Sequence, residues 1–426
     1  MARLALLSTA GLLALALAGG NAQSESRGPK APRFEVLAHV EPGDGATTAD
    51  VFARDGYAYL SSWRGTCTSK GVRVYDMRNP RRPVKVSSFA DAQVEPEVAG
   101  SWSEKTIVQR VSTGAFVGTL AVTSFQSCRA GGFQGFGLYD VTVPEHPRRL
   151  SLQRTDPRGS HEIWLQPARG RAYVYTAINY SEQTSGADYD PKTGNVTIPG
   201  KPDFRIFDVS DPGRPAEVGS WGAWVKLGVH PTAGRGFFKR NFVHSVIGNA
   251  NGTRAYLSYW DLGTVILDVT RPADPRYLGR TPPASNPEGD VHSAALGQNG
   301  KLLVETQESR IGTARLFDIS NERKPRFLRE LKLPGLRNPV PGEPFYIDSV
   351  HDPKVRGKTA YFSWYRQGVV AADISKPGKA RVLARFLPPA GQVSEPMFWG
   401  VFAEPGKDYV LASDFGSGLW VVRFRR

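Results

Sequence analysis

One motif recurs along the chain and constrains its fold more than any other feature. An apolar run leads into Asp, which is followed by an apolar residue, usually Ser or Thr, and in most copies Pro at four and seven residues beyond the Asp. Successive motifs lie 50 to 68 residues apart. Their acidic residues are Asp76, Asp140, Asp208, Asp268, Asp318 and Asp373.

The spacing within this motif predicts a strand, a turn and a second strand. A short apolar, β-branched run is typical of a buried strand. Asp and Ser or Thr side chains bond the backbone amides just ahead of them and close a turn, and Pro then ends the ladder. A new extended segment follows, as in Pro215–Trp221. We therefore interpret the six Asp residues as structural turn residues rather than catalytic ones.

A second hairpin precedes each motif, so that every repeat holds about four strands. In one repeat, for example, it comprises His244–Gly248 and Arg254–Trp260. Repeats of this length with four strands each are typical of β-propellers, with one blade per repeat. The chain's 45 Gly and 32 Pro residues in 426 also favour many short strands joined by turns over a helical protein.

The two ends of the repeat array predict how the ring closes. Six repeats end with the Asp motif, and a seventh begins near Phe398 but stops after its third strand, Gly418–Phe424. The segment Pro32–Pro42 resembles fourth strands such as Ala380–Pro389. If it completes the last blade, no sheet edge stays open. We predict one all-β domain over residues 33–426, a seven-bladed β-propeller of four-stranded blades closed by the N-terminal strand.

These turns give the chain a resemblance to a known family. The Asp-Val-Ser-x-Pro-x-x-Pro turns after a short apolar strand resemble those of LVIVD-repeat proteins, which are exported bacterial β-propellers. Ser349–Ser375, Leu257–Val269 and Ala412–Arg423 are especially similar. The resemblance covers nearly all of the chain beyond its N-terminal segment, and it implies a fold rather than an activity. The last blade departs from the pattern, with Arg423 in the place of the repeat Asp.

The N-terminus has the features of a signal peptide. Arg3 precedes an apolar run, Leu4–Ala18, and small residues follow at Gly20 and Ala22. This pattern predicts a signal peptide over residues 1–22, cleaved near Ala22, and then a short segment, 23–32. The run is too short to predict a membrane span, although an uncleaved anchor is the alternative. We expect a protein exported to the periplasm, cell envelope or medium, and not integral to a membrane.

Two cysteines and the charge distribution narrow the chemistry further. Cys67 and Cys128 are an even pair, placed in the predicted loops of blades one and two, and in an exported chain they predict a disulfide. The net charge of +14 is scattered as single residues and pairs, so we expect no nucleic-acid partner. Nucleophile elbows, phosphate-binding glycine loops and zinc-protease helices are missing, so no motif indicates an enzyme.

Four of the seven histidines share one repeat position, at the start of the first strand of blades three to six. The aligned positions elsewhere are Asp50, Glu104 and Trp399, the first two by a loose alignment. Innermost strands would carry all of these to one mouth of the central channel. Four imidazoles there are compatible with a divalent transition-metal site or with acid–base chemistry, and the structural alternative is that each bonds the backbone of a neighbouring blade. The metal-ligand candidates are His161, His244, His292, His351, Glu104 and Asp50.

Aromatic and charged residues at the ends of the second strands are predicted to surround the same mouth. Such residues at loop tips suit ligand recognition, although the Trp residues can instead pack between blades. Two long irregular segments, Asn179–Asp203 and Ala223–Asn241, also map to this face and suggest a lid or partner surface. The ligand-binding candidates are Trp63, Trp260, Asp261, Glu305, Trp364, Arg366, Trp399 and Asp414.

These observations support three functional hypotheses. The first is a scaffold that binds an unidentified protein or small molecule through the histidine-lined mouth. The second is a metal-dependent enzyme, of a hydrolase or oxidase type, that uses the channel histidines as ligands. The third is a purely structural protein of the cell envelope. A complete fold without a recognised catalytic set favours the first.

Overall fold

The computed structural model describes most of the chain beyond its N-terminal segment. The predicted signal peptide, residues 1–22, lies outside the described residues, as does most of the irregular segment Asn179–Asp203. None of the helices within the described residues has the length and apolar character to cross a membrane. The described residues are 31–63, 67, 70–155, 159–178, 202–236, 239–283, 289–344, 346–393 and 395–426.

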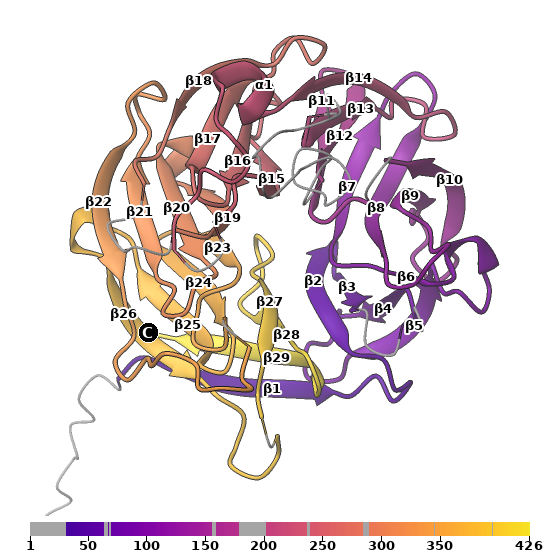
Figure 1. Ribbon diagram of the computed structural model, residues 1–426. Helices are drawn as coiled ribbons and strands as arrows, with labels where there is room; N and C mark the ends of the chain where they lie inside the picture. Colours follow the sequence, from indigo (N-terminus) through magenta and orange to yellow (C-terminus); the bar gives the residue numbers. More distant parts are fainter. Residues whose placement is uncertain are drawn as a thin grey trace, which may run out of the picture. The chain divides into compact units, whose positions relative to one another are not determined.

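Seven antiparallel sheets, counted over the described residues, follow one another along the chain and surround a central axis as blades (Figure 1). Neighbouring strands in a blade are mostly consecutive in the chain. The predicted seven-bladed β-propeller is therefore confirmed. Blade one holds β2 (Thr48–Arg54), β3 (Tyr57–Ser62), β4 (Val72–Asp76) and β5 (Val84–Phe89); blade two holds β6 (Ser101–Trp102), β7 (Thr106–Ser112), β8 (Val117–Ser127), β9 (Gly135–Asp140) and β10 (Arg148–Arg154).

Blades three to six keep the four-strand plan, with one short helix, α1 (Ala223–Leu227), after blade three. The strands of blades three and four are β11 (Ile163–Ala168), β12 (Arg171–Ala177), β13 (Phe204–Asp208), β14 (Ala216–Trp221), β15 (Val243–Gly248), β16 (Arg254–Tyr259), β17 (Gly263–Asp268) and β18 (Arg276–Arg280). Those of blades five and six are β19 (Val291–Gly297), β20 (Leu302–Gln307), β21 (Ala314–Asp318), β22 (Arg326–Leu331), β23 (Pro353–Arg356), β24 (Thr359–Trp364), β25 (Gly368–Asp373) and β26 (Arg381–Phe386).

The N-terminal strand closes the ring, as predicted. Blade seven contains β27 (Phe398–Phe402), β28 (Val410–Asp414) and β29 (Gly418–Arg425), and its fourth strand is β1 (Arg33–Val40). β1 runs antiparallel to β29 along its whole length (Figure 1). The outer edge of β29 is thereby paired, which removes an open edge that would otherwise invite aggregation.

The six repeat Asp residues each end the strand that precedes the outermost strand of a blade. In every case one carboxylate oxygen accepts a hydrogen bond from the backbone N–H two residues further on, at 2.8 to 3.0 Å. This bond closes the turn into the outermost strand without any partner outside the motif. The residues concerned are Asp76, Asp140, Asp208, Asp268, Asp318 and Asp373.

The hydrophobic core lies largely between neighbouring blades. Ile206 and Trp221 of blade three, for example, share one buried cluster with Leu257 and Val265 of blade four. Each blade is therefore covered on both faces, which explains the continuous apolar runs of its middle strands.

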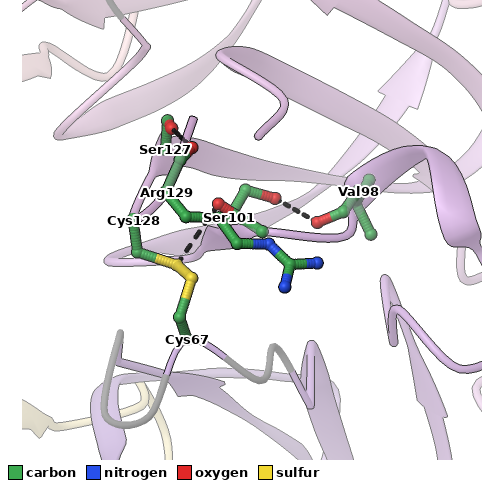
Figure 2. The surroundings of a disulfide bond; sticks show 7 residues. Cys67, Val98, Ser101, Ser127, Cys128 and Arg129 are labelled. Atoms are coloured by element: carbon green, nitrogen blue, oxygen red, sulfur yellow. Dashed lines mark hydrogen bonds between the residues drawn. A yellow bond between two sulfur atoms is a disulfide. The ribbon is translucent and has the colours of Figure 1, made fainter. Parts of the chain in front are cut away.

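A disulfide joins blades one and two, as predicted. Cys67 lies between β3 and β4, Cys128 follows β8, and their Cα atoms are 5.7 Å apart. Figure 2 shows the bond beside the Cys128 backbone, where the carbonyl of Gly100 also accepts the backbone N–H of Cys128 at 2.9 Å. The bond ties two successive blades through cysteines that lie 61 residues apart in sequence.

Candidate functional site

In blades one, four, five and seven the innermost strand starts with an irregularity in its pairing, which turns a side chain toward the axis. In blade four the pairing passes from Val243 to Ser245, and His244 is skipped. Blade seven likewise skips Trp399, between Phe398 and Gly400. A bulge of this kind removes a residue from the ladder and redirects its side chain.

Two layers of side chains result, each with one residue from every blade. The first, here called the histidine layer, holds the skipped residues and their equivalents; the second, the charged layer, holds the next residue of each blade. The histidine layer is Ala49, Glu104, His161, His244, His292, His351 and Trp399. The charged layer is Asp50, Lys105, Glu162, Ser245, Ser293, Asp352 and Gly400.

The register revises one predicted alignment. Asp50 was aligned with the histidines, but the pairing in blade one passes from Thr48 to Val51, so that Ala49 takes the histidine position. Asp50 lies one layer further along the axis, with its carboxylate directed at Gly400. Glu104 does lie in the histidine layer, where it accepts a hydrogen bond from Trp399 Nε1 at 2.7 Å.

The four histidines form a continuous arc. His161 Nε2 lies 2.9 Å from His244 Nε2, and the ring centroids of His244 and His292 are 4.1 Å apart. The centroids of His292 and His351 are 4.0 Å apart, and His351 contacts Trp399 at 4.5 Å. All four imidazoles are at most 8% exposed, so they lie inside the propeller rather than at an open mouth.

Burial sets the protonation state of this arc. It lowers the pKa of His161 to about 3, and it lowers the pKa values of His244, His292 and His351 well below the ordinary range. The Lys105 cation acts in the same direction on all four. The imidazoles are therefore neutral at pH 7, the form that offers a lone pair to a metal ion.

The charged layer is organised around Lys105. Its Nζ lies 2.7 Å from Glu162 Oε2, 3.5 Å from Asp352 Oδ2 and 3.6 Å from Asp50 Oδ2. Lys354 Nζ also contacts Asp352 Oδ2, at 2.6 Å. Three buried carboxylates thus face two amines, of which only the Lys354 side chain is appreciably exposed, at 25%.

Burial and charge act in opposite directions on these groups. Burial raises the pKa of Glu162 to about 7, although Lys105 opposes the shift. Burial also opposes ionisation of Asp352, but Lys105 and Lys354 together bring its pKa below the ordinary value. Burial alone would lower the pKa of Lys105, yet the surrounding carboxylates raise it well above its usual range. Lys105 is therefore a fixed buried cation.

A cavity of about 400 Å³ lies on the axis next to the charged layer. Its walls are apolar, with Phe52, Ile107 and Trp164 among them, and Asp50 and Glu162 also line it. A second hollow of about 870 Å³ shares Trp164 as well as Ile247 and Lys354, and extends to the turns that follow the innermost strands. The first cavity is therefore on the far side of the charged layer from the histidines.

Several predicted ligand-binding residues make hydrogen bonds within the fold. Asp261 accepts backbone N–H groups of Arg235, Arg240 and Asp290, and so anchors the irregular segment before blade four. Asp414 similarly accepts the backbone N–H groups that surround the turn after β28.

Other members of that predicted set are committed to buried internal partners. Glu305 forms an ion pair with Arg315 and accepts hydrogen bonds from two threonine hydroxyls. Arg366 forms an ion pair with Asp348 at 2.6 Å, and Trp364 Nε1 donates to the Asp348 carbonyl at 3.1 Å.

Three predicted tryptophans do lie at the histidine layer. Trp260 packs against His244 with ring centroids 5.1 Å apart, and Trp399 is itself a member of the layer. Trp63 contacts Trp399 at 5.7 Å and Trp102 at 5.4 Å. These rings help to cover the imidazoles on the side away from the cavity.

Sequence reasoning missed the groups with the most unusual environments: Lys105, Glu162, Asp352 and Glu308. The first three directly follow histidine-layer residues. A charged residue immediately after the layer position was therefore visible in the sequence, in the pairs Glu104–Lys105, His161–Glu162 and His351–Asp352. Glu308 follows β20, and its Oε2 lies 3.7 Å from His292 Nε2.

Comparison with known proteins assigns no family. No family model matches the chain, and no curated protein matches it.

Proposed function

We propose that this chain is an exported, ligand-binding β-propeller of the LVIVD-repeat type, and that its ligand occupies the axial cavity. The observation that carries the proposal is the cavity itself, with an apolar wall and a floor of buried charges. Clefts of several hundred Å³ with a few convergent polar groups are the usual form of small-molecule sites. A cavity on the axis also favours a small molecule over a protein partner.

The floor of the cavity indicates the chemistry of the ligand. Glu162 Oε1 and Asp50 Oδ1 are buried without a hydrogen-bond partner among the described residues, as is Oε2 of Glu404, which also lines the cavity. Unsatisfied buried acceptors are costly, and a ligand with donors would satisfy them. Since three carboxylates of the charged layer face two amines, a neutral or cationic ligand suits the floor better than an anion. We infer a small hydroxyl- or amine-bearing molecule with one apolar face.

The disulfide supports the proposal that the protein is exported. Cys67 and Cys128 are paired, and such bonds persist in oxidising compartments outside the cytoplasm. The repeated Asp turns support the relationship to LVIVD-repeat proteins, because every copy of the motif forms the same backbone-capping bond.

A thermal-shift and calorimetric panel tests the proposal. The probes are monosaccharides, amino alcohols and diamines, with succinate to represent anions. A binder at a hundred times its Kd stabilises the folded state by about 2.7 kcal/mol. Trp164→Ala and Glu162→Gln should weaken each hit, whereas Asp318→Asn in a repeat turn should not. Preferential binding of succinate, or hits that neither cavity substitution affects, would refute the assignment.

A further inference from the structure

We propose that the histidine layer binds a divalent first-row transition metal ion through Nε2 of His161, His244 and His292 and the carboxylate of Glu308. One potential ligand atom from each of His244, His292 and Glu308 lies within 4.8 Å of the others. His161 Nε2 lies next to His244 Nε2. This inference goes beyond the cavity and its organic ligand, since the ion would lie in the histidine layer.

In His161 and His292, the hydrogen bond made by Nδ1 leaves Nε2 as the ring nitrogen with a lone pair. His161 Nδ1 lies 2.6 Å from Gln126 Oε1, and His292 Nδ1 lies 3.0 Å from the carbonyl of His351. The His351 carbonyl can only accept, so His292 Nδ1 carries the proton and its Nε2 does not. With the Gln126 amide oriented so that its oxygen faces His161, the same holds for His161. Histidines that bind metals are typically oriented in this way, with the other ring nitrogen donating to a carbonyl or carboxylate.

The contact between His161 and His244 is informative because only one nitrogen of the pair can carry a proton there. If His244 Nε2 donates to His161, then His244 Nδ1 is a buried acceptor, and it has no hydrogen bond of normal geometry among the described residues. If instead His244 Nδ1 carries the proton, two lone pairs face each other at 2.9 Å. A cation removes this conflict, because two nitrogens bound to one ion at 2.0–2.1 Å lie about 2.9 to 3.4 Å apart.

Glu308 supplies the fourth ligand and is itself held in place. Its Oε2 lies 3.7 Å from His292 Nε2, and the hydroxyl of Tyr365 donates to its Oε1. A carboxylate anchored through one oxygen can direct the other at an ion. Ligand atoms around a tetrahedral ion are about 3.4 Å apart, so the ligand atoms of His244, His292 and Glu308 need to approach one another by up to roughly 1.4 Å on binding. His161 joins this set from its place beside His244.

The donor set points to a class of metal. Imidazole nitrogens suit Zn²⁺, Fe²⁺, Ni²⁺ and Cu²⁺, and one carboxylate is compatible with all of these ions, whereas an all-oxygen site would favour Mg²⁺ or Ca²⁺. His351 is placed as a supporting residue. Its Nδ1 lies 2.6 Å from the carbonyl of Trp399, and its ring packs against His292.

Metal titration of the purified full chain tests the site directly. After treatment with chelator, the protein is titrated with Co²⁺, followed by its visible absorption, and with Zn²⁺, followed by calorimetry. We expect one equivalent of either ion. Glu308→Gln, which keeps an acceptor for Tyr365, and His244→Gln should each weaken binding about ten-fold or more. His146→Gln is the matched control, because His146 is exposed in the turn between β9 and β10.

Each outcome decides the question. Failure of the wild-type protein to bind either ion stoichiometrically overturns the proposal, and so does equal weakening by His146→Gln. Circular dichroism shows whether a variant is folded. If His244→Gln does not fold, the wild-type stoichiometry and Glu308→Gln decide. The metal-free protein can still bind the organic probes in its cavity, so failure here is distinguishable from failure of the proposed function.

Discussion

Replacing Lys105 with Met should destabilise the protein strongly, and more at alkaline than at acidic pH. The substitution keeps the length of the side chain but removes the cation that faces three buried carboxylates. Those carboxylates lie at 2.7, 3.5 and 3.6 Å from Nζ. With an effective dielectric constant of about 20, each contact corresponds to about 5 to 6 kcal/mol of attraction.

The net loss is smaller than this sum. Removing the cation also removes the cost of burying it, and the carboxylates can take up protons instead. Removal of one partner from a buried ion pair usually costs about 3–5 kcal/mol, and we expect that range here. An unfolding entropy of about 2.1 cal/mol/K per residue over about 400 residues converts the loss to a fall in Tm of about 4 to 6 °C.

The pH dependence follows from the direction of the pKa shifts. Burial already raises the pKa of Glu162 to about 7, and loss of Lys105 would raise the carboxylate pKa values further. Between the unfolded value near 4.5 and the raised folded value, the folded state binds more protons than the unfolded state. Stability contributed by these groups therefore falls as the pH rises through that window. The deficit of the variant should be small at pH 5 and full at pH 8.

The assay is urea or thermal unfolding at both pH values, with Lys354→Met as the matched control. Lys354 contacts Asp352 alone among these carboxylates and is 25% exposed, so its loss should cost about 1 kcal/mol or less. A second variant, Lys105→Met with Glu162→Gln, should recover part of the stability. A Lys105→Met protein no less stable than the control, or one with a larger deficit at pH 5, would refute this electrostatic account.

Three further predictions concern the ring. Replacing Cys67 and Cys128 together with Ala should cost about 4 kcal/mol in unfolding experiments, from the entropy of the 61-residue loop, and thiol titration of the unreduced, denatured wild type should detect no free thiol. Gly400→Ala should lose about 1–3 kcal/mol, because its Cβ would lie 2.2 Å from Asp50 Oδ1, whereas Gly416→Ala, with nothing within 4 Å, should unfold like wild type. Deleting residues 31–40 should expose the edge of β29 and increase aggregation in light scattering; an unchanged monomer would count against ring closure by β1.

The fold was largely predictable because the repeats form the same strands and turns through the same local interactions. The Asp turn needs no partner outside its own motif, so its sequence pattern is readable in six of the seven blades. Ring closure followed from counting strands, and the disulfide from an even pair of cysteines. The residues in the charged layer were harder to predict. Lys105 and Glu162 look like surface residues in sequence, and only the position beside the axis buries them.

One error of detail has its physical cause in irregular backbone at the start of a strand. The bulge in blade one shifts Asp50 by one position relative to the histidines. Glu308, which the sequence did not single out, directly follows β20 and lies beside His292. Periodicity predicts which residues alternate inside a strand, but it does not locate the residue where pairing is interrupted.

The asymmetry of the histidine layer coincides with the place where the ring is closed. Ala49, Glu104 and Trp399 break the run of histidines, and they belong to blades one, two and seven. These neighbouring blades also carry the disulfide and the closing strand β1. Blades three to six keep the regular repeat and carry the four adjacent imidazoles. The three proposed histidine ligands therefore come from adjacent blades that contain neither the disulfide nor the closing strand. Each blade of a propeller contributes one side chain to each layer. Because the non-histidine residues of this layer are confined to blades one, two and seven, the imidazoles of blades three to six form an uninterrupted set of metal-ligand donors.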